Sequence, residues 1–99
     1  LETISSFEVK EKLDRGEDFI LLDIRSDEEY RKFKRIEDDR VIRVPLEELR
    51  VRMSELPKDK EIVIICQIGS RAYEAYRILR GAGFNNVKVM EGGLALWFW

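Results

Sequence analysis

The 99-residue sequence contains no histidine, so it lacks the side chain that most often exchanges protons near neutral pH. This absence excludes Ser-His-Asp hydrolases, Cys-His proteases and zinc sites that use histidine ligands. Cysteine occurs once, at Cys66, so neither an internal disulfide nor a C-x-x-C redox pair can form. Any chemistry that Cys66 performs must therefore proceed without an imidazole base.

Other features are also missing. No apolar run approaches the ~20 residues that span a membrane, and no signal peptide is visible, so we expect a cytoplasmic protein without membrane contact. The net charge is −2 and no basic patch stands out, so no nucleic-acid partner is expected. No metal or cofactor is predicted.

Asparagine and glutamine together number only three, whereas 38% of the residues are charged, a balance that resembles proteins from thermophiles. Hydrophobic residues make up 44% of the chain, which is enough for one core. We therefore expect a single domain over residues 1–99.

Four mainly apolar runs predict strands. They are residues 19–24, 41–44, 61–65 and 86–90. Because helical patterns lie between them, the sequence predicts an α/β domain with a central, mostly parallel sheet and helices on both faces. In such sheets ligands bind beyond the carboxyl ends of the strands, and Cys66 directly follows the strand at 61–65.

The predicted helices have recognisable starts and inner faces. Capping-box spacings from Ser5 to Glu8 and from Ser26 to Glu29 open the first two helices, and Gly16 ends the first. Apolar residues at helical spacing predict the inner faces, which are Tyr30 and Phe33 in the second helix, Leu46, Leu49, Met53 and Leu56 in the third, and Ala72, Ala75, Tyr76 and Leu79 in the fourth.

The segment CQIGSR, residues 66–71, joins a predicted strand to a helix N-terminus. Backbone N–H groups there have no helical partner and can converge on an anion, and Gly69 allows the backbone to curl. A thiolate of Cys66 among these donors, with the Arg71 cation nearby, is stabilised and becomes a nucleophile. The alternative is that Cys66 is a small buried hydrophobic residue and Arg71 a solvated helix residue.

Four segments in order resemble the rhodanese family of sulfurtransferase domains. They are LLDIRSDEEY (21–30), VPLEEL (44–49), CQIGSRA (66–72) and GFNNVKVMEGGLALW (83–97), and they cover most of the chain. The pattern is similar to single-domain rhodaneses and to the rhodanese domain of coenzyme A disulfide reductases. The resemblance implies the rhodanese-like fold with a five-stranded sheet.

The resemblance also implies a sulfurtransferase in which Cys66 becomes a persulfide, taking sulfur from a donor such as thiosulfate or polysulfide and passing it to a thiol or cyanide. The loop residues expected to bind substrate are Gln67, Ile68, Gly69, Ser70 and Arg71. The spacing C-x4-R favours sulfur over the phosphate chemistry of related C-x5-R phosphatases. Alternatives are a sulfur-carrier or interaction module of a larger redox enzyme or attached partner, and a catalytically inactive regulatory domain, which the intact Cys66 disfavours.

One segment departs from the family. Where rhodaneses usually have Gly-His-Ile-x-Gly-Ala, this chain has a longer and more charged segment, KRIEDDR at residues 34–40, in which only Ile36 is retained. We expect this connection to be rebuilt.

The remaining candidates have structural interpretations. Asp23 and Arg25 match the family's Asp-x-Arg and are expected to tie the first long strand to neighbouring loops. Gly92-Gly93 indicates a tight turn and only weakly a nucleotide site. Trp97 is expected to pack, whereas residues 98–99 are either terminal caps or a contact surface.

Overall fold

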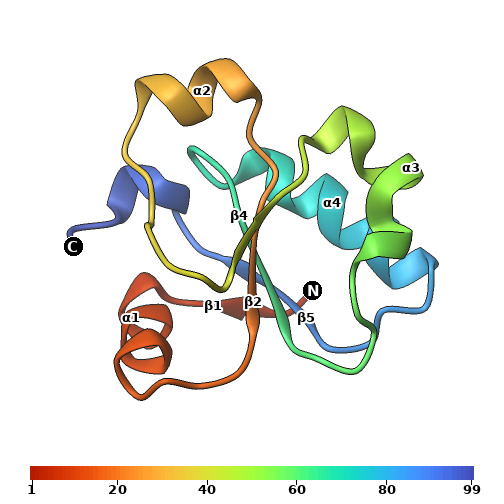
Figure 1. Ribbon diagram of the computed structural model, residues 1–99, viewed down its shortest axis with the longest axis horizontal. Coiled ribbons are helices and arrows are strands. Elements are labelled where there is room, and N and C mark those ends of the chain that lie inside the picture. The colour runs from red at the N-terminus through yellow and green to blue at the C-terminus, as the bar shows by residue number, and fades with distance from the viewer.

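Five parallel strands form one sheet in the computed structural model, which describes residues 1–99 (Figure 1). The strands are β1 (Thr3–Ile4), β2 (Ile20–Asp23), β3 (Val41–Arg43), β4 (Ile62–Ile65) and β5 (Val87–Met90). Their order across the sheet is β1-β5-β4-β2-β3, so β4 is central. The α/β prediction is confirmed, and the sheet is entirely parallel.

Helical segments connect the strands. They are α1 (Ser6–Asp14), α2 (Asp27–Lys32), α3 (Leu49–Arg52) and α4 (Ser70–Gly81), with the short 3₁₀ turns η1 (Leu46–Glu48), η2 (Met53–Glu55) and η3 (Gly93–Leu96). Both predicted capping positions are used, since the side chains of Ser5 and Ser26 accept hydrogen bonds from the amides of Glu8 and Glu29. No helix is long and apolar enough to cross a membrane.

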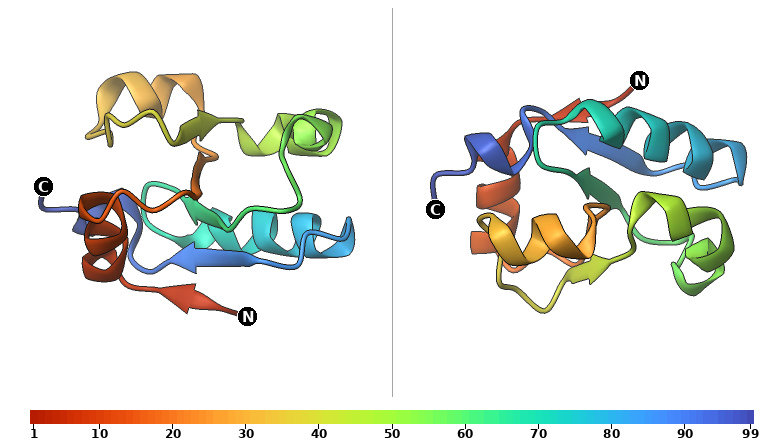
Figure 2. Two further views of the ribbon diagram at one scale, coloured as in Figure 1. Left: turned by 60° about the horizontal axis from the view of Figure 1, so that its bottom comes forward. Right: turned by 90° about the horizontal axis from the view of Figure 1, so that it is seen from above.

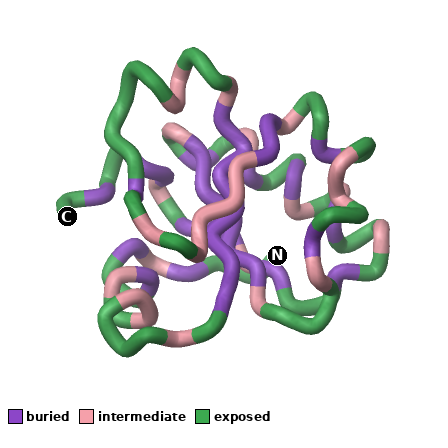
Figure 3. The backbone as a smooth tube through the Cα atoms, viewed as in Figure 1, coloured by how far each residue is buried: buried purple, intermediate pink, exposed green.

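The two faces of the sheet are covered by different helices, as the sequence predicted. Alternate residues of β4 divide between them, because side chains along a strand point to opposite faces. Ile62 and Ile64 belong to a core cluster shared with α3 and α4, whereas Val63 and Ile65 belong to a second cluster shared with α1 and η3. In Figure 1 α3 and α4 lie on one side of the strands and α1 and the C-terminal segment on the other, and Figure 3 shows the burial concentrated along the central strands.

The strand predictions agree with the structure to within one or two residues at each end, but β1 was not among them. This strand is only two residues long and pairs with β5 through Thr3 and Ile4. A two-residue strand carries no periodic signal, so it is defined by its partner and not by its own sequence.

Two helix predictions need correction. Phe33 does not form an inner face, because its side chain is 48% exposed and no residue of α2 is buried. The reason is position: α2 lies over the carboxyl end of the sheet and not against a face (Figures 1 and 2). The ring of Tyr30 instead faces the guanidinium of Arg43, with its centroid 3.7 Å from Cζ. The predicted third helix is broken into η1, α3 and η2, although Leu49 and Leu56 are buried as expected.

The charged segment 34–40 is held by one ion pair, by hydrogen bonds to backbone carbonyls and by one apolar anchor. Ile36 is buried in the second core cluster. Arg40 pairs with Asp38, with 2.7 Å between Nε and Oδ1, and its Nη1 donates to the carbonyl of Glu17 at 2.9 Å. Charged hydrogen bonds therefore fix a connection that contains no glycine.

Candidate functional site

Cys66 lies at the carboxyl end of the central strand of the sheet. All four residues of β4 are buried, and β2 and β5 flank the strand on either side. The Cys66 side chain is itself buried, at 1% exposure. The chain's only thiol thus directly follows the central, fully buried strand of the sheet.

The loop that follows folds back over the sulfur atom. The amide of Gly69 donates to Cys66 Sγ at 2.8 Å. Gly69 is the N-cap residue of α4 and has φ of +100°, a conformation that residues with a Cβ rarely adopt. The glycine expected to let the backbone curl does so, and it places a donor on the sulfur.

Two carbonyl groups of the loop accept hydrogen bonds from η3. The amide of Leu94 donates to the carbonyl of Cys66 at 2.8 Å, and the amide of Ala95 donates to that of Gln67 at 2.9 Å. Because N–H and C=O point in opposite directions in a trans peptide, the amides of Gln67 and Ile68 point away from η3. These two amides make no backbone hydrogen bond, and the first turn of α4 adds amides without a helical partner. The loop therefore offers several N–H donors to an anion.

Gly93 makes the contact between η3 and the loop close enough for these bonds. A Cβ at this position would lie 2.6 Å from the carbonyl oxygen of Cys66 and 2.7 Å from that of Gln67. The φ of Gly93 is also positive, at +62°. The predicted Gly92-Gly93 turn exists, and it also supports the loop.

A buried ion pair anchors the base of the loop. Arg25 is fully buried and binds the carboxylate of Asp23 through Nε at 3.0 Å and Nη2 at 2.8 Å. Its Nη1 donates to the Gln67 side-chain oxygen at 3.0 Å and to the carbonyl of Lys34 at 2.9 Å. One guanidinium thus joins the end of β2, the loop and the charged segment 34–40. The side chain of Gln67 is used in this tie.

Arg71 is bound to a partner that the sequence did not indicate. Its Nη2 lies 2.6 Å from both carboxylate oxygens of Glu29, a residue of α2. The hydrogen bond that Arg71 donates to Glu29, and the attraction of that carboxylate, raise the pKa of Arg71, which stays charged. The same hydrogen bond from Arg71 lowers the pKa of Glu29. The pair therefore stays ionised at neutral pH, and the loop's cation is shared with a carboxylate.

The remaining loop side chains face outward. Ile68 is 68% exposed and Ser70 is exposed as well, so neither side chain encloses the sulfur. The structure brings Cys66, Gly69 and Arg71 into one loop, with Asp23 and Arg25 beneath it. It places the Gln67 side chain on Arg25 and leaves those of Ile68 and Ser70 at the surface.

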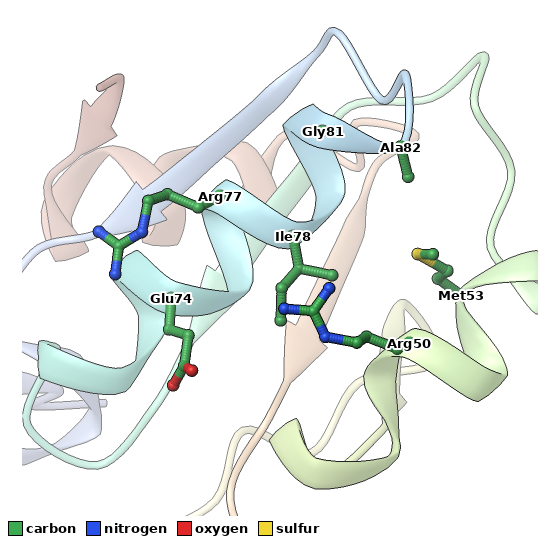
Figure 4. A pocket seen from close by; sticks show the side chains of 7 residues that line it. All are labelled: Arg50, Met53, Glu74, Arg77, Ile78, Gly81 and Ala82. Carbon is green, nitrogen blue, oxygen red and sulfur yellow. The ribbon is translucent and has the colours of Figure 1, made fainter.

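The largest cavity of the structure, about 530 Å³, lies elsewhere, between α3 and α4 (Figure 4). Its lining includes Arg50, Met53 and Ile78 but no residue of the loop. Arg50 and Arg77 at its rim are exposed, which is usual for solvated helix faces. Because this cavity lacks the nucleophile and any buried polar group, the Cys66 loop is the better candidate for chemistry.

Sequence reasoning missed two residues of the site. Glu29 was assigned only as a helix cap, and its pairing with Arg71 joins positions 42 residues apart. Gly93 was assigned only to a turn. A glycine pair directly after a strand was the available signal for Gly93, whereas no local signal existed for Glu29.

Comparison with known proteins places this geometry in a family. The model of the rhodanese-like domain family matches residues 6–98. A sulfurtransferase of Allochromatium vinosum is 35% identical over 94 residues, which are 95% of this chain and 85% of that protein.

Two solved structures are also similar. An NAD-dependent persulfide reductase from A. fulgidus matches with 48% identity and a TM-score of 0.82, over 99% of this chain and 16% of that one. Bacillus anthracis CoADR-RHD matches with 35% identity and a TM-score of 0.83, over 98% of this chain and 16% of that one. This chain spans about one sixth of each of these two proteins. The family model, the similar proteins, the parallel sheet and the cysteine loop all agree, and the chain belongs to the rhodanese-like domain family.

Proposed function

We propose that Cys66 is the nucleophile of a sulfurtransferase and carries the transferred sulfur as a persulfide. The observation that carries this proposal is the hydrogen bond from the Gly69 amide to Cys66 Sγ, within a loop whose other amides have no backbone partner. Such donors stabilise a thiolate and, after transfer, the anionic outer sulfur. No imidazole is needed for this activation.

The proposed reaction has two balanced steps. The Cys66 thiolate attacks the outer sulfur of a donor such as thiosulfate or a polysulfide, and a new S–S bond forms. The donor's own S–S bond breaks, and its electron pair leaves with sulfite or with the shortened polysulfide. An acceptor thiolate or cyanide then attacks the outer sulfur of the persulfide, and the Cys66 thiolate is released.

The loop residues have separate parts in this proposal. The amides of residues 67–71 bind the transferred sulfur, and Arg71 adds a positive charge at the rim of the loop. Asp23 and Arg25 hold the loop from below and do not touch the donor, because Arg25 is fully buried.

A second candidate is a sulfur-carrier module that exchanges sulfur with an attached or partner enzyme and turns over little by itself. The observation that favours it is the match to about one sixth of two larger proteins, one of them described as a persulfide reductase. Such a module uses the same Cys66 persulfide, but its acceptor is another protein site.

Intact-mass analysis tests the persulfide. After incubation with thiosulfate or polysulfide, the protein should gain one sulfur atom, and Cys66→Ala should gain none. Equal adducts in both proteins would contradict the proposal. Repeated turnover with cyanide or a small thiol then distinguishes the free enzyme from the carrier, which forms the adduct but releases it slowly to small acceptors.

A further inference from the structure

We propose that Glu29 sets the donor preference of the Cys66 loop: by holding Arg71, it disfavours compact dianionic donors such as thiosulfate relative to persulfides with one negative charge. This inference rests on the proposed function, because it concerns the donor that the same loop accepts.

The first support is the geometry of the pair. Arg71 Nη2 lies at 2.6 Å from each carboxylate oxygen of Glu29, and the Arg71 side chain is 38% exposed at the rim of the loop. A sulfonate that approached this guanidinium would meet the carboxylate at the same place. Two like charges in contact repel, so the donor must share or displace Glu29.

The second support is that α2 fixes Glu29 independently of Arg71. Glu29 occupies the N3 position of the capping box. Its Oε1 accepts from the backbone amide of Ser26 at 3.1 Å and from the Ser26 hydroxyl at 3.2 Å. Its own amide donates to the Ser26 hydroxyl at 3.2 Å. A carboxylate held in this way does not swing aside freely when an anion arrives.

The third support is that the other arginine near the loop, Arg25, is not available to a donor. Arg25 is fully buried, and the carboxylate of Asp23 neutralises it. Glu47 adds a further negative charge that acts on Arg71. The loop therefore has no unshared guanidinium for a dianion, although its amides remain able to bind one anionic sulfur.

The test variant is Glu29→Gln, which removes the charge and keeps the shape. Glutamine also serves at the N3 position of a capping box, so α2 retains its cap. The matched control is Glu28→Gln on the same helix, because Glu28 is 74% exposed and its nearest cation is Lys32 at 3.5 Å. Both variants change the net charge by the same amount.

The first measurement is kcat/KM for sulfur transfer to cyanide from thiosulfate and from 2-hydroxyethyl persulfide. Glu29→Gln should raise the thiosulfate-to-persulfide ratio about ten-fold, the scale of one hydrogen bond to a charged group. Glu28→Gln should leave the ratio unchanged. An equal change with both donors, or a fall in the ratio, would show that Glu29 only shapes the loop and would overturn the inference.

The second measurement does not depend on sulfur transfer. Iodoacetate and iodoacetamide alkylate a thiolate similarly, but iodoacetate carries one negative charge and iodoacetamide none. Glu29→Gln should raise the rate of Cys66 alkylation by iodoacetate relative to the rate with iodoacetamide. In the Arg71→Ala background the same change should have a smaller effect, because the guanidinium is gone. A wild type that forms no persulfide refutes the proposed function, whereas an unchanged alkylation ratio refutes the role of Glu29.

Discussion

Gly93→Ala tests whether η3 holds the Cys66 loop in place. The added Cβ would lie 2.6 Å from the carbonyl oxygen of Cys66 and 2.7 Å from both the carbonyl carbon and oxygen of Gln67. All three are backbone atoms, so no side chain can rotate away. Ordinary contact begins at 3.4 Å, and the loop or η3 must therefore shift by most of an ångström.

Two effects contribute to the expected loss of stability in Gly93→Ala. An alanine at φ of +62° costs about 1–2 kcal/mol, because its Cβ crowds the following carbonyl. Overpacking against fixed backbone costs about 1–3 kcal/mol more. We expect the free energy of unfolding to fall by about 3 kcal/mol, which corresponds to a melting temperature lower by roughly 15 °C for a domain of this size.

Gly16→Ala is the matched control, because Gly16 has φ of +69° but nothing within 4 Å of the added Cβ. Its free energy of unfolding should fall only by the cost of an alanine at positive φ, about 1 kcal/mol. Urea unfolding followed by circular dichroism gives both values, and the rate at which iodoacetamide labels Cys66 reports the loop. The reasoning fails if Gly93→Ala is no less stable than Gly16→Ala and labels Cys66 at the wild-type rate.

Two further predictions concern charge. Arg25→Ala leaves the carboxylate of Asp23 buried without its cation and should lower the free energy of unfolding by about 3–5 kcal/mol. Arg52→Ala at the surface should change it by less than about 1 kcal/mol, and equal losses in urea titrations would contradict this. For Glu61, burial, the largest influence, raises the pKa, but hydrogen bonds and attraction from two lysines outweigh it and lower the pKa below its ordinary value of 4.5. The ionised Glu61 therefore stabilises the fold fully above pH 4.5, and this contribution is lost as the pH falls through the lower pKa of the folded state. Between about pH 6 and about pH 3 the free energy of unfolding should fall less in Glu61→Gln than in the wild type. Parallel plots of unfolding free energy against pH for the two proteins would refute this.

Much of the fold was predictable because its signals are local. Continuous apolar runs indicated β2 and β4, and serine caps marked the first turns of α1 and α2. The errors arose where position in space decides the outcome. β1 exists only through its pairing with β5, and α2 lies over the end of the sheet, so Phe33 stays exposed.

The candidate site was predictable in part for the same reason. The loop 66–71 is contiguous in sequence, so its cysteine, glycine and arginine could be recognised by residue type and spacing. The pairing of Arg71 with Glu29 and the tie from Arg25 to Gln67 each join positions 42 residues apart, which no local pattern encodes. The roles proposed for the loop residues, the cytoplasmic location and the thermophilic source stay predictions.

The pairing of β1 with β5 has a consequence for the order of folding. Thr3 lies opposite Val89 in the sheet, so the partner of this strand comes 86 residues later in the chain. During synthesis β1 therefore waits until almost the whole segment described here has left the ribosome, while β2, β3 and β4 can already pair with one another. Such distant contacts slow folding, and they make closure of the sheet at β5 the step that joins the first residues to the rest.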